Sequence, residues 1–564
     1  MLSKIFKLVS IIIFFLYQNS LYSKTTADVD FNPKYLTNYL SALLAYDNQN
    51  NNKAIKYFNS SKNLIKKHDK FLKQYVFSLV LNGQVKDAIK QIKSSKNKNS
   101  TNFFEAYVLL LVDSLQKQKF EKSDLILNEL QKFKNYGTYQ FVIYETLKSY
   151  KNLFESKKID NNVEQNFGKL SLINEAFQNC YLENPRAKSN FLNLINSDDG
   201  DYSRYLFFYL SSIIKDKDLE TAKQIAQTID ELESNLLINQ SKSWINNSKL
   251  ELFEKVFSCQ KDENILSEFF FLISNFLASE EKFDKSNFYL NISTYLNPKF
   301  YFHLSHLVEN YYENKNYDSA KEVLKKFNDE DDVFYWYKLK KLSQIIAKQQ
   351  SSEQALSFIE EKFTDILNPS VKVIFDMGNI YKNNGKFEKS IEIYSIVLNQ
   401  LDEKSDSYAE ILYRRGSSFE RIGEHSKSDD DLLKSLSIKP NSPYVMNYLA
   451  YSWLERKHNI DEALNMLEKA YQQRKNDPYI IDSVGWGYYL IEDFINAEKF
   501  LKRAVELMPF DPIVNDHYGD VLWKLGRKIQ ARYYWNNTLK LDDVDDEMKK
   551  NILKKIIKGV KISS

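Results

Sequence analysis

The sequence has 564 residues, more than one hydrophobic core usually holds, so we expect several domains or a repeat array. Its charge is nearly balanced, with 78 Lys and Arg against 75 Asp and Glu, which excludes a strongly basic nucleic-acid-binding protein and a polyacidic one. Only 13 Gly and 9 Pro are present, far fewer than turn-rich β folds or glycine-rich nucleotide-binding folds require. The composition therefore predicts an all-α protein.

Residues 1–27 have the layout of an export signal. Lys4 and Lys7 precede an apolar run over residues 8–17, and a polar stretch follows. This run is too short to span a bilayer, for which about 20 residues are needed. No Cys follows it, which argues against a bacterial lipoprotein. We expect export to the periplasm or cell envelope, with an uncleaved N-terminal anchor as the alternative.

The chain has two cysteines, Cys180 and Cys259. Two cysteines do not make a disulfide framework in a protein of this length. We expect buried, inert thiols, and the alternative is that the two pair in an oxidising compartment.

Small residues recur with a period of 34 to 38 residues, each near the start of a predicted second helix. They are Ser286, Ala320, Ala355, Ser390, Ser428, Ala463, Ala497 and Ala531. Such a period is that of a unit of two helices. Bulky side chains are excluded where two helix axes approach closely, so a small residue of the first helix is expected to face a small residue of the second. Residues 478–509 show the full pattern, with Val484, Gly485 and Tyr488 followed by Ala497, Leu501, Ala504 and Pro509.

This pattern resembles the tetratricopeptide repeat (TPR). The resemblance implies a right-handed α-solenoid of helix-turn-helix repeats. We assign residues 267–543 to a TPR array, 28–137 to degenerate TPR-like repeats and 138–266 to divergent helical repeats. We expect a continuous α-solenoid with a degenerate middle, and the alternative is a break into two arms near residues 140–200 or 240–265.

Residues 544–564 are rich in lysine around one apolar helical stripe, formed by Ile552, Leu553, Ile556, Ile557 and Val560. Solenoids need such a helix to cover the apolar face of their last repeat, so we expect a capping helix. The alternative is a membrane-surface helix, with peripheral membrane contact through residues 548–564 or through the N-terminal segment.

No motif of an enzyme or a cofactor site is present. The sequence lacks HExxH, the phosphate-binding glycine loops and the G-x-S-x-G elbow. His303 and His306 stand three residues apart and could hold a metal, but packing or a place on the surface is the expected role. Acidic residues 429–431 are expected to form a solvated face. We predict no catalysis, no cofactor and no metal.

Solenoids bind partners on the concave surface lined by their first helices. Positions 2, 5, 9 and 12 of each first helix form one stripe there. The predicted groove residues on this stripe are Tyr444, Asn447, Tyr451, Tyr479, Asp482, Trp486, Tyr489, Asp516, Asp520 and Trp523. Rings beside carboxylates suit a peptide-like segment of a protein partner, particularly a basic one. The alternative is that the rings fill the packing between repeats while the carboxylates only solvate the surface.

These features together predict a non-catalytic protein-interaction scaffold of the bacterial envelope, similar to exported bacterial TPR proteins, which generally organise envelope or secretion assemblies. Two other functions fit the same sequence. One is an accessory or regulatory subunit of an envelope enzyme of polysaccharide or cell-wall synthesis. The other is a membrane-surface tether.

Overall fold

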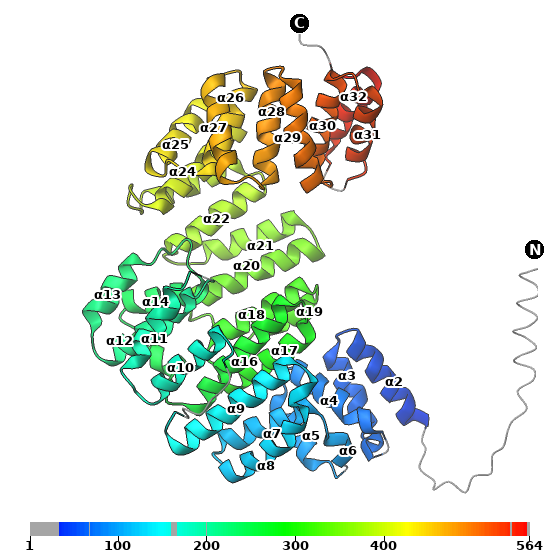
Figure 1. The fold of residues 1–564 in the computed structure, drawn as a ribbon, viewed down its shortest axis with the longest axis vertical. Helices are drawn as coiled ribbons and strands as arrows, with labels where there is room; N and C mark the ends of the chain where they lie inside the picture. The colour runs from blue at the N-terminus through cyan, green and yellow to red at the C-terminus, as the bar shows by residue number, and fades with distance from the viewer. Residues whose placement is uncertain are drawn as a thin grey trace, which may run out of the picture. The chain divides into compact units, whose positions relative to one another are not determined.

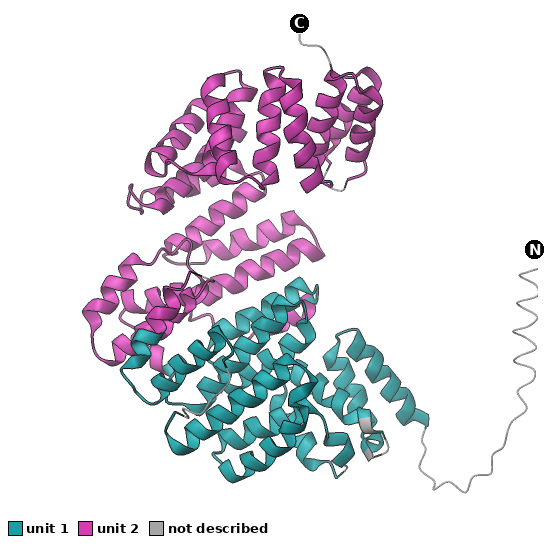
Figure 2. Cartoon of the chain, viewed as in Figure 1, with its two compact units in different colours: residues 1–190, 255–316 teal, residues 191–254, 317–564 magenta. Residues whose placement is uncertain are grey.

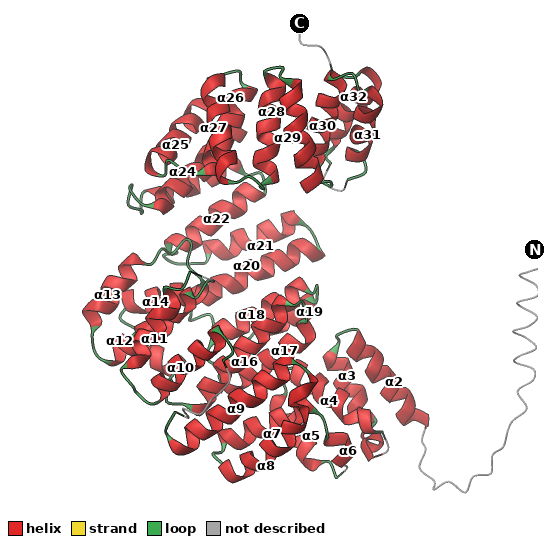
Figure 3. Ribbon diagram, in the orientation of Figure 1, coloured by secondary structure: helices red, strands yellow, loops and turns green. Residues whose placement is uncertain are grey.

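The computed structural model describes residues 33–66, 68–96, 98–159, 166–198, 200–541 and 544–560. These residues form helices and connecting loops, with no strand among them, so the predicted all-α fold is confirmed (Figures 1 and 3). The expected export signal, residues 1–27, lies outside the described ranges.

The chain divides into two compact units, each made of two stretches (Figure 2). Unit 1 contains residues 1–190 and 255–316, and unit 2 contains residues 191–254 and 317–564. The chain passes between the units within α11 (Arg186–Ile195) and within α15 (Glu251–Val256). Both passages fall in the stretches where the alternative to a continuous stack placed a break. The predicted boundaries between the degenerate repeats (28–137), the divergent repeats (138–266) and the TPR array (267–543) were drawn from sequence similarity, and they stay predictions.

In unit 1 the second stretch packs on the first rather than simply following it. The Tyr311 hydroxyl donates a hydrogen bond of 2.9 Å to the carbonyl of Leu81, 230 residues earlier. Asp262 accepts hydrogen bonds from Tyr181 and Gln118. The expectation of one continuous stack is therefore wrong for unit 1. Its helices are α2 (Pro33–Asp47), α3 (Asn51–Ser60), η1 (Lys62–Lys66), α4 (Asp69–Leu81), α5 (Val85–Ser94), α6 (Lys98–Thr101), α7 (Phe104–Gln116), α8 (Phe120–Leu130), η2 (Gln131–Tyr136), α9 (Thr138–Ser156), α10 (Lys169–Tyr181), α16 (Asp262–Ser279), α17 (Phe283–Leu296) and α18 (Tyr301–Glu313).

A disulfide between Cys180 and Cys259 joins the two stretches of unit 1. The expectation of free, buried thiols is thus wrong, because the chain leaves unit 1 after α10 and returns to it before α16. Both cysteines lie next to these passages. The bond closes a loop with a sequence separation of 79 residues, and a loop of that size corresponds to about 4 kcal/mol of chain entropy in the unfolded state.

Unit 2 contains the regular repeat array. Its first stretch folds as η3 (Ser203–Tyr205), α12 (Leu206–Lys215), α13 (Leu219–Thr228) and α14 (Leu236–Asn246). Its second stretch begins with α19 (Tyr317–Leu324) and continues as helix pairs. These are α20 (Asp332–Gln349), α21 (Ser352–Thr364), α22 (Val371–Asn383), α23 (Phe387–Leu398), α24 (Asp406–Arg421), α25 (His425–Ile438), α26 (Pro443–Glu455), α27 (Ile460–Gln473), α28 (Pro478–Leu490), α29 (Phe494–Leu507), α30 (Pro512–Lys524) and α31 (Lys528–Thr538), followed by α32 (Asp546–Lys558).

The small residues that define the period lie where two helices meet. All eight stand in the second helix of a pair and are buried, from Ser286 in α17 to Ala531 in α31. Gly485 on the first helix lies against Leu501, one turn after Ala497, rather than against the small residue itself, and a Cβ added to it would lie only 2.6 Å from Leu501 Cγ. A Cβ on Gly519 would lie 2.4 Å from the Trp535 indole nitrogen. Close approach at these positions is therefore what excludes larger side chains.

We expect Gly485→Val to destabilise unit 2 by about 1–3 kcal/mol, because the new side chain overpacks the contact between α28 and α29. Leu501→Ala alone leaves a cavity and costs about 2–5 kcal/mol. The double variant should lose less stability than the sum of the two, since the smaller side chain makes room for the valine. Urea unfolding followed by circular dichroism measures all three. Strictly additive losses would contradict the close approach of these helices.

Candidate functional site

The predicted groove residues lie on the first helices of unit 2, and contacts link these helices in one row from α20 to α32. We call this side of α20, α22, α24, α26, α28 and α30 the first-helix face. Successive helices of the row are joined by polar and aromatic contacts, which are Lys340–Asp376, Arg414–Asn379, Tyr413–Tyr448, Trp486–Glu455, His517–Asp482 and Lys555–Asp516.

A stack of three rings occupies the centre of the acidic part of this face. The Trp486 indole lies between Tyr489, at 4.6 Å between ring centroids, and His517, at 4.0 Å. Both pairs are within 12° of parallel. The Trp486 indole N–H donates a hydrogen bond to Glu455 at the end of α26. Tyr489 is buried, whereas the Glu455 carboxylate is exposed. The stack is therefore packed into unit 2 at Tyr489 and lies beside an exposed negative charge at Trp486.

Asp482 is buried beside this stack, where it pairs with His517. His517 Nδ1 lies 2.9 Å from an Asp482 carboxylate oxygen. Although burial lowers the pKa of His517, the Asp482 carboxylate and the nearby Asp516 and Asp520 raise it above its ordinary value. Sequence reasoning missed His517, because it stands at position 6 of its helix, off the stripe that was read. Because the Asp482 carboxylate is paired with His517, it is less available to a ligand than the sequence predicted.

The tyrosines on α26 differ from one another in exposure. Tyr444 is exposed, and its hydroxyl donates to Asp477 at 3.3 Å. Tyr451 is partly buried, and burial raises the pKa of its hydroxyl, with contributions from the Glu455 and Asp482 charges. The side-chain oxygen of Asn447 is buried and has no hydrogen-bond partner among the residues that the structure describes. Tyr479 on α28, 62% exposed, completes the predicted set on these two helices.

The last three predicted residues, on α30, meet the C-terminal helix α32. Lys555 Nζ lies 2.7 Å from an Asp516 oxygen and 2.8 Å from an Asp520 oxygen. Asp520 also accepts a hydrogen bond of 3.0 Å from the Trp535 indole N–H and is only 3% exposed. Trp523 lies against Gly559, just after α32. The structure therefore places Asp520 inside the capping contact and not on an open surface.

Burial and the neighbouring Asp516 charge raise the pKa of Asp520 to about 6, although Lys555 lowers it. A carboxyl whose folded-state pKa lies above its unfolded value favours the folded state most when it is protonated. This contribution to stability is present below about pH 4 and is lost as the pH rises through 6.

The helix α32 packs by one side only. Ile552 is buried against α30 and α31, as expected for a capping helix, and Arg532 of α31 donates to the Ile556 carbonyl at 2.9 Å. Leu553 and Ile557 remain exposed on the other side. No helix among the described residues is long and apolar enough to cross a membrane. Peripheral membrane contact through residues 548–564 stays a prediction.

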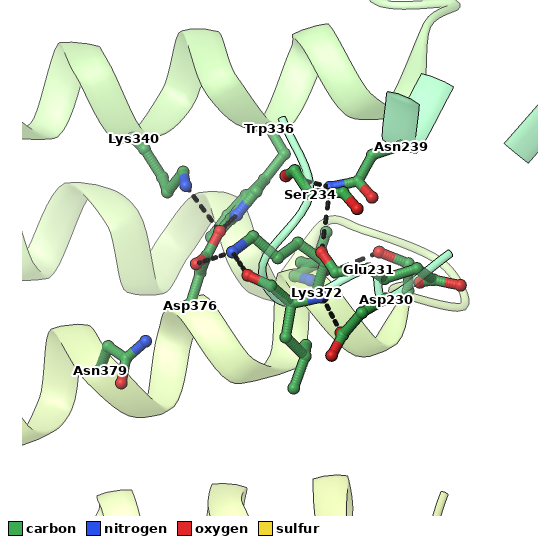
Figure 4. Close-up of polar contacts among 12 residues, drawn as sticks. Asp230, Glu231, Ser234, Asn239, Trp336, Lys340, Lys372, Asp376 and Asn379 are labelled. Carbon is green, nitrogen blue, oxygen red and sulfur yellow. Dashed lines mark hydrogen bonds and ion pairs between the residues drawn. The ribbon is translucent and has the colours of Figure 1, made fainter. Parts of the chain in front are cut away.

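The opposite end of the first-helix face is basic, which the sequence stripe did not single out. Lys340 on α20 and Lys372 on α22 both bind Asp376, at 2.6 and 3.4 Å, and the Trp336 indole N–H donates to the same carboxylate at 2.9 Å (Figure 4). Lys372 also donates to the Leu232 carbonyl at 2.7 Å.

A segment of the first stretch of unit 2 thus lies against α22 and α24 (Figure 4). Leu232 packs with the buried side chains of these helices and of α23. Asp230 accepts a hydrogen bond from Ser407, just inside α24. The chain itself therefore covers the N-terminal halves of α22 and α24. Leu232 packs there, its carbonyl accepts from Lys372, and the Asp230 carboxylate accepts from Ser407.

Two further expectations are decided by the structure. His303 is buried, with Nδ1 2.8 Å from Ser293 Oγ, so its packing role is confirmed. No group of three or more potential metal ligands occurs in the described part of the chain.

The prediction that residues 429–431 form a solvated acidic face is wrong for Asp429 and Asp431. Asp431 is buried and holds Arg415 at 2.8 Å, and Asp429 holds Arg456 at 2.7 Å.

Comparison with known proteins agrees with the repeat geometry. The sequence model of the tetratricopeptide repeat matches residues 371–395, which contain α22 and most of α23. A TPR repeat-containing protein of Pseudomonas aeruginosa is 23% identical over 176 residues, 31% of this chain. The chain therefore contains a tetratricopeptide repeat. Its match spans only 29% of the length of that relative.

Solved TPR structures also align with parts of this TPR chain. A tetratricopeptide repeat protein from Parabacteroides merdae is 17% identical, with a TM-score of 0.38, over 46% of this chain and 98% of that one. A thermophilic TPR protein of Thermus thermophilus is 16% identical, with a TM-score of 0.30, over 33% of this chain and 100% of that one.

We expect Lys555→Met to raise the pKa of Asp520 above 6, because the lysine charge is what opposes burial there. The Trp535 indole N–H donates to Asp520, so its ¹H–¹⁵N signal reports this titration in protein labelled at tryptophan. Lys554→Met removes an exposed charge from the neighbouring position and should leave the midpoint unchanged. An unchanged midpoint in Lys555→Met as well would show that the TPR cap does not depend on this ion pair.

Proposed function

We propose that this TPR protein is a non-catalytic interaction scaffold of the bacterial cell envelope whose first-helix face binds a basic, extended segment of a protein partner. TPR proteins generally mediate protein–protein interactions, and they typically do so without catalysis. The basic nature of the segment, the site of binding and the envelope location are the parts that the proposal adds.

The observation that carries the proposal is the way the protein already holds a lysine. Lys555 inserts between Asp516 and Asp520 at one end of the first-helix face. Two carboxylates can bind one ammonium group in this way because each oxygen accepts a charge-assisted hydrogen bond. The exposed Glu455 offers a carboxylate on the same face, beside Trp486, where a lysine or arginine would also meet the ring.

The exposed apolar side chains support an extended ligand. Tyr444, Tyr479 and Ile513 are all exposed and stand at the second position of three successive first helices. Such a row, one side chain per repeat, offers contacts to a segment that runs across the helices. The carboxylates beside the row set the preference for positive charge.

We expect Glu455→Lys to weaken the binding of a fluorescein-labelled peptide rich in lysine and tyrosine about tenfold, because it reverses a charge beside the proposed ligand. Fluorescence polarisation measures the dissociation constant. Glu392→Lys, on the exposed side of α23, is the matched control and should have no effect. Equal binding by both variants and the unaltered protein would reject the first-helix face as the binding site.

Export is supported by the layout of residues 1–27 and by the disulfide, since disulfides persist in oxidising compartments. Expressed in a bacterial host, the full chain should reach the periplasmic fraction with both cysteines blocked to alkylation. Deletion of residues 2–23 should leave the chain in the cytoplasm with reactive thiols. Intact mass separates a cleaved signal from an uncleaved anchor. A full-length chain that stays in the cytoplasm with free thiols would contradict the proposal.

A further inference from the structure

Two basic side chains, one near the end of α22 and one at the end of α24, have no anionic partner among the described residues. Lys382 stands in the last turn of α22, and Arg421 ends α24. Neither side chain forms an ion pair or a hydrogen bond with any residue in the described ranges. Lys382 Nζ lies 5.8 Å from the centre of the Tyr413 ring, and the Arg421 guanidinium lies 6.0 Å from the centre of the Phe387 ring.

Other basic residues on α20, α22 and α24 already have hydrogen-bond or ion-pair partners. Lys340 and Lys372 share Asp376, and Lys372 also holds the Leu232 carbonyl. Arg414 donates to Asn379 at 3.2 Å, and its Nε lies 2.8 Å from Glu410. Among the described basic residues of α22 and α24, only Lys382 and Arg421 thus lack an ion pair or a hydrogen bond.

The environment of Lys382 disfavours its charge. Burial lowers the pKa of Lys382 to about 8, and repulsion from Arg414 and Arg421 adds to this, while Glu410 acts in the opposite direction. A partly buried ammonium group without a counter-ion is costly, and a carboxylate brought to it removes that cost.

We infer that Lys382 and Arg421 bind carboxylate side chains of the same partner segment whose basic residues bind over α26–α30. This inference rests on the proposed function. It adds that the partner segment carries acidic residues at one end and basic residues at the other. Charge complementarity along the face supports it. The unpaired cations lie on α22 and α24, and the exposed Glu455 carboxylate lies at the end of α26.

The spacing of the helices sets the length of the ligand. Packed helices lie about 10 Å apart, so the path from α24 to α28 is about 20 Å. An extended chain rises about 3.3 Å per residue and covers this path with about six residues. The segment therefore separates its acidic group from its basic group by about six residues.

The test uses three labelled peptides and the full-length protein. The first peptide carries two glutamates, a six-residue spacer containing tyrosine, and two lysines. The second replaces both glutamates with glutamine, and the third shortens the spacer to two residues. The unaltered protein should bind the first peptide at least about fivefold more tightly than the other two.

Lys382→Met should remove this preference, lowering affinity for the first peptide about fivefold and leaving affinity for the glutamine peptide unchanged. Arg421→Gln changes an exposed side chain and gives a second test that does not depend on tolerance of Lys382→Met. The matched control is Lys502→Met, which removes an exposed lysine from α29. Circular dichroism melts verify the fold of each variant.

Each other outcome overturns one of the two ideas. Equal losses for the first and the glutamine peptide, or no loss in either variant, would reject the carboxylate site, whereas the basic site would stand if Glu455→Lys still weakened both peptides. Binding of all peptides that is insensitive to Glu455→Lys, or no binding by the unaltered protein, would reject the proposed function and the inference with it.

Discussion

The close approach of the two helices in each repeat is the constraint on which the rest of unit 2 depends. Gly485 against Leu501 and Gly519 against Trp535 leave no room for a Cβ, so these contacts fix how far each first helix can rotate. Once that rotation is fixed, the stripe of positions 2, 5, 9 and 12 is set beside the contact between the two helices, and Asp520 at position 9 reaches Trp535 of α31 from it. The same small residues that hold a repeat together therefore also determine which side chains face a ligand.

This constraint explains why the array was predictable from sequence. A steric requirement for small residues recurs once per repeat, and a periodic signal such as Ala463, Ala497 and Ala531 can be read without knowing the fold. The pairing of charged side chains does not recur in every repeat, even where the two partners are one repeat apart. Lys555 and Asp520 are 35 residues apart, as are His517 and Asp482, and neither pair differs in sequence from ordinary surface charges. The sequence therefore predicted which charged residues lie on the first-helix face, but not which residues they pair with.

The failures of prediction in unit 1 have a different physical origin. Its first stretch packs on a second stretch that returns only after residues 191–254, so contacts such as Tyr311 with Leu81 are set by the path of the chain between them. The disulfide has the same cause. Cys180 and Cys259 stand at the two ends of the stretch that folds into unit 2, and only the return of the chain brings them together. Their separation of 79 residues in the sequence therefore gives no sign that Cys180 and Cys259 are neighbours in the fold.

Lys555 and Lys382 show how one helix row can use the same residue type in two ways. Both are lysines against first helices of unit 2, and burial disfavours the charge of each. At Lys555, Asp520 and Asp516 outweigh burial and raise the pKa of the ammonium group, which keeps the helix cap in place. At Lys382 the nearest strong charges are mostly positive, and its pKa falls. The first arrangement is complete within the chain. The second lacks only its anion, and a partner that supplies one would gain the stabilisation that Asp516 and Asp520 provide at the cap.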